Sequence, residues 1–282
     1  MPIDVRPLSD RLGAEIRGVD LARPMDDAVR QAIRLAFVEH KVATFRDQTL
    51  TAAQLLAFCR LFGEVRPNRV RAQNYHPEQP EIYILSSDDI DVFGRNQRIA
   101  QGDYWHTDQS YNERPAIATC LYSVETPSIG GDTKFIDMAA AYDALPQRLR
   151  ARLDGATAEH VLVVNEPVFG IAGAPASTNP PATPPVYHPA VKVHPETGRK
   201  ALYVSPGTTV RLMGMERAES DALLAEVFAR VIRPAAEYRH KWTHREVLMW
   251  DNRSLIHSAT NEVPADQRRV MYRALIEERR AA

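Results

Sequence analysis

The sequence is poor in cysteine, with only Cys59 and Cys120 among 282 residues. Both lie in largely apolar stretches, L-L-A-F-C-R and A-T-C-L-Y. Two thiols cannot form the disulfide framework that holds small secreted domains together. We therefore expect reduced thiols in the core and a cytoplasmic protein.

Long apolar runs and an excess of one charge are also missing. No run approaches the roughly 18 residues of a membrane-spanning helix, and M-P-I-D-V-R-P-L-S-D has no apolar signal core. Lys and Arg number 35 against 36 Asp and Glu, which gives a formal net charge of −1. Neither a membrane nor nucleic acid is therefore an expected partner.

Short apolar strands recur along the sequence, with amphipathic helices before and between them. Predicted strands cover residues 42–45, 190–193, 201–204, 238–242, 247–250 and 270–276, and predicted helices cover 51–63, 137–153 with a break at Pro146, and 221–232. Thr51 and Gln54 fit a capping box, and Gly63 is placed to end that helix. The pattern favours one domain over residues 1–282, of mixed α+β class, built around an antiparallel sandwich or barrel.

Residues 169–185, F-G-I-A-G-A-P-A-S-T-N-P-P-A-T-P-P, differ from the rest of the chain. They contain five prolines, two glycines and no charged residue. Such a segment suits neither a helix nor a central strand, and it is long for a simple connection. It is either a surface loop or a flexible lid over a site.

A histidine two positions before an acidic residue occurs four times, at His76, His106, His194 and His244, where chance supplies about one. H-P-E at 76 and at 194 contains proline, and the second falls in the turn of the predicted 190–204 hairpin. H-R-E at 244 lies in a charged stretch that suits a solvated edge. Only H-T-D at 106 is flanked by large aromatic residues, in Y-W-H-T-D-Q-S-Y.

His106 and Asp108 would need a third ligand to form a metal site. Two histidines and one carboxylate make the facial triad typical of non-haem Fe(II) enzymes. His257, in W-D-N-R-S-L-I-H-S-A-T, follows a short apolar run and is a candidate, although a lone histidine there is more often structural.

The late segment Q-R-R-V-M-Y-R adds a possible anion site. On a strand, Arg269, Met271 and Arg273 share one face, and Arg268 lies on the other. Buried arginines need anionic partners, and arginine binds carboxylates bidentately. The alternative is an edge strand whose arginines face solvent.

Taken in order, W-H-T-D, G-G-D-T (130–133), M-W-D-N-R-S-L-I-H and Q-R-R-V-M-Y-R resemble the TauD/TfdA family, as do F-R-D-Q near 45, L-F-G-E near 61 and F-I-D-M-A-A-A-Y-D-A-L-P near 135. The likeness spans nearly the whole chain. It implies a double-stranded β-helix, or jelly roll, with flanking helices. It also implies an Fe(II)- and 2-oxoglutarate-dependent dioxygenase that uses O₂ and forms homodimers or tetramers.

The resemblance also implies roles for individual residues. His106, Asp108 and His257 match the iron ligands, and Thr133 and Arg269 match the pair that holds the distal carboxylate of 2-oxoglutarate. Arg273 matches the arginine that meets the anionic group of the substrate, with Arg268 as the fallback for these arginine roles if the register differs. The resemblance thus implies that His106, Asp108 and His257 are catalytic and bind the metal, and that Thr133 and Arg269 bind the cosubstrate. It implies that Arg273 and Asn68 bind the substrate.

The resemblance implies that 2-oxoglutarate is oxidatively decarboxylated to succinate and CO₂ while a substrate C–H bond is hydroxylated, in some cases with later C–heteroatom cleavage. The related halogenases lack the carboxylate ligand, so Asp108 predicts hydroxylation. Asn68 and Gly102 stand where the taurine enzyme has other substrate-contacting residues, which argues against taurine. The expected substrate is a small carboxylate, aryloxyalkanoate, sulfonate or alkylsulfate.

Three other functions are also compatible with these residues. One is a carboxylate hydroxylase of a biosynthetic pathway. A second is a cupin-like hydrolase or isomerase with zinc or manganese at His106, Asp108 and His257, which leaves Thr133 and Arg269 unexplained. The third is a non-catalytic barrel that binds an anion through Arg269 and Arg273.

Overall fold

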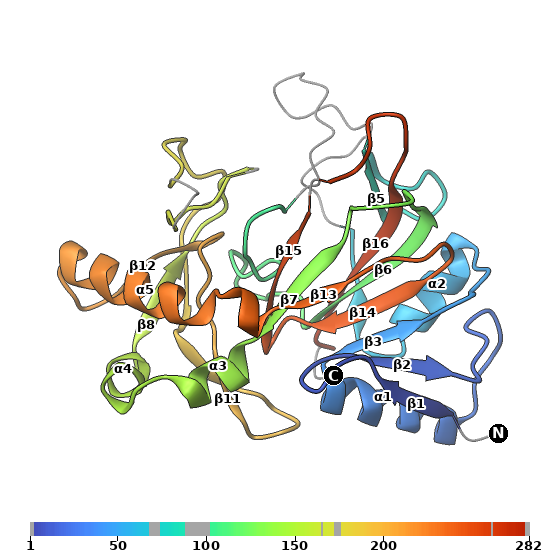
Figure 1. Cartoon of the computed structure of the whole chain (residues 1–282), viewed down its shortest axis with the longest axis horizontal. Helices are drawn as coiled ribbons and strands as arrows, with labels where there is room; N and C mark the ends of the chain where they lie inside the picture. Colours follow the sequence, from blue (N-terminus) through green and yellow to red (C-terminus); the bar gives the residue numbers. More distant parts are fainter. Residues whose placement is uncertain are drawn as a thin grey trace.

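Two β-sheets face each other at the centre of the computed structural model, which describes residues 3–67, 74–87, 102–164, 166–171, 176–260 and 262–279 (Figure 1). The large sheet has the order β1-β2-β3-β14-β6-β16-β4, and β5 also pairs with β16. Its strands are β1 Asp4–Pro7, β2 Ala14–Arg17, β3 Val42–Phe45, β4 Glu64–Val65, β5 Tyr83–Ser86, β6 Ala118–Glu125, β14 Val247–Asp251 and β16 Val270–Glu277. The small sheet has the order β13-β7-β15, with β7 Thr133–Asp137, β13 Tyr238–His240 and β15 Leu255–Ala259.

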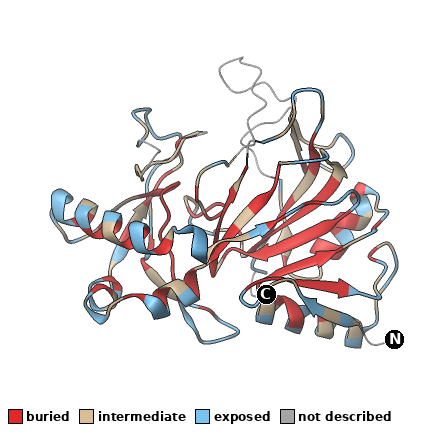
Figure 2. Cartoon of the chain, viewed as in Figure 1, coloured by how far each residue is buried: buried red, intermediate tan, exposed pale blue. Residues whose placement is uncertain are grey.

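Alternating side chains of the large sheet build two separate cores. On β14, Val247 and Met249 face helices α1 (Asp27–His40) and α2 (Ala52–Cys59). Leu248 and Trp250 face the small sheet. The fold is therefore the predicted jelly roll with flanking helices, and burial follows the strands closely (Figure 2).

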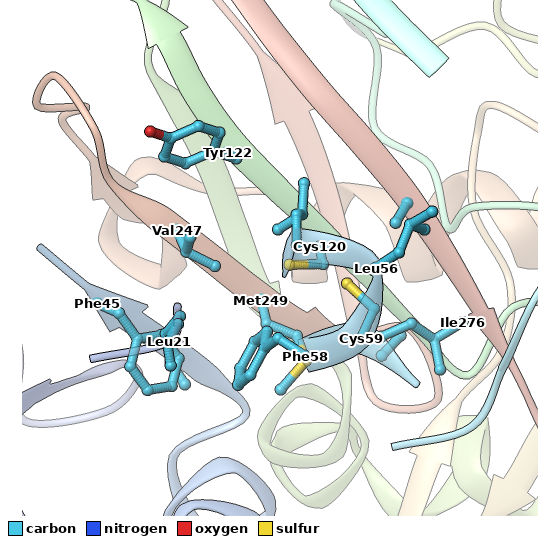
Figure 3. Close-up of a cluster of buried hydrophobic side chains, with 14 of the residues drawn as sticks. Leu21, Phe45, Leu56, Phe58, Cys59, Cys120, Tyr122, Val247, Met249 and Ile276 are labelled. Atoms are coloured by element: carbon cyan, nitrogen blue, oxygen red, sulfur yellow. The ribbon is translucent and has the colours of Figure 1, made fainter. Parts of the chain in front are cut away.

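The two cysteines belong to the core beneath α2. Cys59 on α2 and Cys120 on β6 are free thiols with 0% of their surface exposed. Figure 3 shows both side chains in this core, near Leu56, Phe58 and Ile276. A hydrogen bond with the Cys59 thiol and burial raise the pKa of Cys120, so it remains a neutral thiol at neutral pH.

A second lobe packs against the outer face of the small sheet. It contains helices α3 Met138–Ala144, α4 Gln147–Leu153 and α5 Arg217–Val231, the sheet β12-β8-β9, and the hairpin β10-β11. The strands of this sheet and hairpin are β8 Thr157–His160, β9 Val186–Pro189, β10 Val191–Val193, β11 Lys200–Leu202 and β12 Thr209–Leu212. The 3₁₀ turn η2 Pro234–Ala236 follows α5. Ile136 of β7 and Ile256 of β15 face this lobe, so their neighbours Phe135 and Leu255 face the space between the sheets.

Most predicted elements are confirmed. The strand at 42–45, the 190–204 hairpin and the three late strands are present, and the helical region 137–153 divides at Pro146. The capping box of Thr51 and Gln54 is also present. The helix ends at Cys59, however, and Gly63 has a different role: a Cβ there would lie 2.2 Å from the carbonyl oxygen of Glu277. The glycine lets β16 approach.

Two interpretations of charged segments are wrong. Glu246 does not lie at a solvated edge, because it has 0% exposure and accepts hydrogen bonds from Thr44 and Thr243. The Q-R-R-V-M-Y-R segment does not form a solvent-facing edge either, because β16 pairs with β6 on one side and with β4 and β5 on the other.

Among the described residues, no helix is long and apolar enough to span a membrane.

Candidate functional site: two histidines, an aspartate and two inward-facing arginines

A backbone bridge brings the two candidate histidine ligands together. The amide of His106 donates to the carbonyl of His257 at 3.0 Å, and the amide of His257 donates to the carbonyl of His106 at 2.8 Å. The imidazole centroids are consequently 4.2 Å apart. His257 occupies β15 on the face that also carries Leu255, so its ring projects between the two sheets, beside Phe135 and Trp250.

Asp108 completes a group of three convergent donors. Its Oδ1 lies 3.8 Å from His106 Nε2, and its Oδ2 lies 3.5 Å from His257 Nε2. One ligand atom from each residue lies within 4.8 Å of the others, and this is the only such group of three among the residues that the structure describes. Two imidazoles and one carboxylate on one side of an ion leave its other coordination positions open.

The protonation states favour metal binding. His106 Nδ1 lies 2.8 Å from the carbonyl oxygen of Tyr104, which only accepts, so Nδ1 carries the proton and Nε2 presents a lone pair toward Asp108. Burial lowers the pKa of His257 to about 3, so that ring is neutral at neutral pH.

The Asp108 carboxylate is ionised for a different reason. Burial alone would raise the pKa of Asp108, but its electrostatic interactions with the neighbouring His257, Arg273 and His106, together with a hydrogen bond from Thr119, outweigh burial and lower that pKa. Thr119 Oγ1 donates to Asp108 Oδ2 at 2.6 Å. The carboxylate is therefore both charged and held in orientation.

Arg269 is buried, and no carboxylate of the described residues is in hydrogen-bonding contact with its guanidinium. Its side chain is 8% exposed, and among the described residues its guanidinium makes one hydrogen bond, from Nε to the carbonyl of Gly131 at 3.0 Å. Burial lowers its pKa to about 10, only partly opposed by the charge of Asp132. Gly131 has a φ of +66°, and a Cβ there would lie 2.7 Å from Arg269 Cδ. Glycine at this position therefore gives the arginine its room.

Thr133 lies in the same region as Arg269. Trp242 Nε1 donates to Thr133 Oγ1 at 3.0 Å, and the Arg269 guanidinium lies 6.0 Å from the centroid of the Trp242 ring. Because the indole uses an acceptor position of the hydroxyl, the Thr133 O–H proton remains available to an anionic ligand.

Arg273 lies beside the triad. Its guanidinium is 3.9 Å from Asp108 Oδ1 and 5.0 Å from the centroid of the Tyr83 ring, and its buried Nε has no hydrogen-bond partner in the described part of the chain. Arg268 points away, toward Glu125 at 3.3 Å, with 55% of its side chain exposed. The strand therefore turns Arg269 and Arg273 inward and Arg268 outward, and the assignment of binding roles to these arginines stays a prediction.

Two further positions, Asn68 and Gly102, were compared with substrate-contacting residues of the taurine enzyme. Asn68 lies outside the described residues. Gly102 directly adjoins the triad: its φ is +83°, and a Cβ there would lie 2.7 Å from Cε1 of His106. A side chain at residue 102 would thus displace the imidazole, which explains why this chain has glycine there.

The described parts of residues 169–185 begin close to the triad. The amide of Phe169 donates to the carbonyl of Pro206 at 2.8 Å, and the amide of Gly207 donates to the carbonyl of Trp105, next to His106, at 2.9 Å. The lid remains a prediction.

Sequence reasoning missed Thr119, Trp242 and Asn252, which support the triad and the arginine region through hydrogen bonds. Trp242 fell inside a predicted strand, and Asn252 fell inside the M-W-D-N-R motif, but neither pattern indicates what its side chain contacts. Thr119 carries no local signal, because its partner Asn252 is 133 positions away in the sequence.

Comparison with known proteins places this chain in a family. The model of the "Taurine catabolism dioxygenase TauD, TfdA family" matches residues 4–275. The (S)-phenoxypropionate/α-ketoglutarate dioxygenase of Sphingobium herbicidovorans is 34% identical over 281 residues, covering 97% of this chain and 94% of that protein. The α-ketoglutarate-dependent sulfate ester dioxygenase of Pseudomonas putida is 34% identical over 278 residues, covering 93% and 85%.

A solved structure gives the same result. A taurine dioxygenase from Burkholderia xenovorans superimposes with a TM-score of 0.82 at 34% identity, covering 98% of this chain and 89% of the other. These matches favour the dioxygenase over the hydrolase and the non-catalytic barrel. The chain belongs to the TauD/TfdA family, and it is a 2-oxoglutarate-dependent dioxygenase that uses O₂.

Proposed function

We propose that this dioxygenase uses Fe(II), held by His106, Asp108 and His257, to hydroxylate a small organic anion. The observation that carries the proposal is the convergence of three donors of the facial-triad type, in a chain that also buries the Arg269 guanidinium with no carboxylate of the described residues in contact. The donors suit the ion, because two neutral imidazoles and one ionised carboxylate match the ligands of non-haem Fe(II).

Iron bound there would supply the open positions at which the 2-oxo acid and O₂ meet, and the redox chemistry that couples decarboxylation to C–H hydroxylation. The protein's own residues hold and orient the side chains that would bind the ion. Tyr104 keeps the proton of His106 on Nδ1, and Thr119 holds the Asp108 carboxylate. The rings of Phe135 and Trp250 lie against the His257 imidazole and help to keep bulk water out.

We infer that Arg269 and Thr133 hold the distal carboxylate of 2-oxoglutarate. A buried guanidinium with free donors is stabilised by a bidentate carboxylate, and the Thr133 hydroxyl can donate a third hydrogen bond. The cosubstrate carboxylate would also offset the burial that lowers the pKa of Arg269.

Arg273 is the proposed anchor for the anionic group of the primary substrate. It lies beside Asp108, so an anion bound to it would be held close to the metal. Relatives act on phenoxypropionate, sulfate esters and taurine, as their names state. We propose a carboxylate, aryloxyalkanoate, sulfonate or alkylsulfate substrate, with possible C–heteroatom cleavage after hydroxylation, and biosynthetic carboxylate hydroxylation as the alternative. We propose Asn68 as a further residue that contacts the substrate.

Three further expectations accompany this function. We propose that residues 169–185 close over the site as a lid within a single domain of residues 1–282, since Phe169 is tethered next to Gly207. We also propose a cytoplasmic location, in line with the free thiols of Cys59 and Cys120. A homodimer or homotetramer is expected, and light scattering in solution would measure it.

The proposed metal and cosubstrate sites can be tested together. Adding Fe(II) and 2-oxoglutarate to the metal-free protein without oxygen should produce a weak metal-to-ligand charge-transfer band in the visible spectrum. The band should be absent in His106→Ala, which removes one imidazole. Folded, iron-loaded wild-type protein that shows no band would overturn the assignment of the triad or of the 2-oxoglutarate site.

Replacing Arg273 with alanine should separate substrate use from cosubstrate use. Loss of one charged anchor is expected to raise the KM for the primary substrate by about 10- to 100-fold. Uncoupled 2-oxoglutarate turnover, measured as succinate release without substrate, should change far less. Arg273→Lys keeps the charge and should fall between. Equal loss of both activities in the alanine variant would exclude Arg273 as the substrate anchor.

A further inference from the structure

The D-N-R segment between β14 and β15 has no role in the proposed chemistry, yet it reaches a metal ligand. Asn252 Nδ2 donates to Thr119 Oγ1 at 2.9 Å, and Thr119 Oγ1 donates to Asp108 Oδ2 at 2.6 Å. These three side chains are 1%, 0% and 7% exposed. They form an Asn252–Thr119–Asp108 hydrogen-bond series that is shielded from water.

The direction of this series is fixed by the chemistry of its members. A threonine hydroxyl has one proton, and it can point that proton at Asp108 only if its other contact is a donor. The amide nitrogen of Asn252 is such a donor. Flipping the amide would place its oxygen against Thr119 and draw the hydroxyl proton away from the carboxylate. Asn252 therefore determines what Thr119 offers to Asp108.

The backbone around Asn252 is held on both sides. The backbone N–H of Asn252 donates to the carbonyl of Ile117 at 3.0 Å, directly before β6. The preceding Asp251 is fully buried, and its carboxylate accepts from His194 Nε2 at 2.9 Å and from Arg253 Nη2 at 2.6 Å. His194, in the turn of the β10-β11 hairpin, thus links this hairpin to the turn after β14. The same turn leads directly into β15, which carries His257.

We propose that Asn252 is a positioning residue for the metal site, acting through Thr119 on the orientation of the Asp108 carboxylate. The inference rests on the proposed function, because it assumes that Asp108 binds the metal. Hydrogen bonds to a ligating carboxylate set its direction and its basicity, and their loss typically lowers metal affinity by about 10- to 100-fold. Without Asn252, the Thr119 proton is free to turn away, and the Asp108 side chain loses its only hydroxyl donor among the described residues.

The experiment measures Co(II) affinity without oxygen, by calorimetry and by the visible bands of the bound ion. Asn252→Ala is expected to weaken Co(II) binding about tenfold. The matched control is Ser254→Ala in the same turn: Ser254 is 2% exposed, and its hydroxyl has no hydrogen-bond partner within the described residues. Its removal should leave Co(II) affinity unchanged. A purely structural role for Asn252 would lower the Tm of the metal-free protein while leaving Co(II) affinity and the bands of the bound ion intact.

A second pair of variants keeps the test decisive if Asn252→Ala does not fold. Thr119→Val has nearly the same shape without the hydroxyl, and should weaken Co(II) binding about 10- to 100-fold. Thr119→Ser restores the donor and should restore affinity. Wild-type affinity in folded Asn252→Ala, or in Thr119→Val, overturns the positioning role alone. Failure of the wild-type protein itself to bind Co(II), with His106→Ala indistinguishable from it, overturns the metal site and the inference together.

Discussion

Replacing Asp108 with alanine is expected to lower hydroxylation by roughly 10³-fold or more, which corresponds to about 4 kcal/mol at the barrier. The carboxylate is the only anionic member of the three-donor group. Its two oxygens lie 3.8 Å from His106 Nε2 and 3.5 Å from His257 Nε2. Alanine leaves two neutral ligands with no charge to balance a divalent ion. Hydroxylated product and succinate, measured at saturating Fe(II) and 2-oxoglutarate, should both fall, and Fe(II) affinity should fall with them.

A carboxylate from the same loop provides the control for this variant. Glu113 is exposed and five positions further along the sequence, so Glu113→Ala should retain wild-type hydroxylation. His106→Ala should instead resemble Asp108→Ala, because it removes a neighbouring donor of the same ion. If folded Asp108→Ala hydroxylates at the wild-type rate, Asp108 is not a ligand, and another carboxylate must be sought.

The fold was predictable largely because strand periodicity is a local property. The apolar run at 247–250 and the capping box of Thr51 are both visible in the sequence, and the two-residue period of a strand then places Val247 and Met249 in one core and Leu248 and Trp250 in the other. The grouping of Arg269 with Arg273 was also predictable, since side chains two apart share a strand face. Which face lies inside was not. That depends on β16 lying between β6 and the β4-β5 side, a contact between segments far apart in the chain.

Buried charge was the least predictable feature. Glu246 lies in a charged stretch that is typical of a surface, yet it is enclosed by Thr44 from β3 and by Thr243. Local composition cannot reveal such partners, because a buried carboxylate is stabilised by donors that only the tertiary fold delivers. Thr119 is a similar case, since only the pairing of β6 with β14 brings Asn252 to it. The motif marks a site in the sequence, and long-range pairing supplies the groups that tune it.

Replacing Arg269 with alanine is expected to raise the KM for 2-oxoglutarate by about 10²-fold, corresponding to about 3 kcal/mol for hydrogen bonds between a guanidinium and a carboxylate. Arg269→Lys should recover only part of this loss, because an ammonium cannot bind a carboxylate bidentately. The adjacent Arg268 provides the control, since it faces Glu125 at the surface. Arg268→Ala should leave the KM unchanged, and the opposite pattern would mean that the two arginines have been assigned in the wrong register.

A change in the cosubstrate isolates the contact itself. 2-Oxovalerate has the same chain length as 2-oxoglutarate, with a methyl group in place of the distal carboxylate. Wild-type protein should discriminate against it by about 10²-fold, whereas Arg269→Ala should use both acids about equally poorly, so the coupling energy approaches 3 kcal/mol. If Arg269→Ala keeps the full discrimination, the distal carboxylate is held by other groups, and Thr133 with Trp242 behind it would be the next residues to replace.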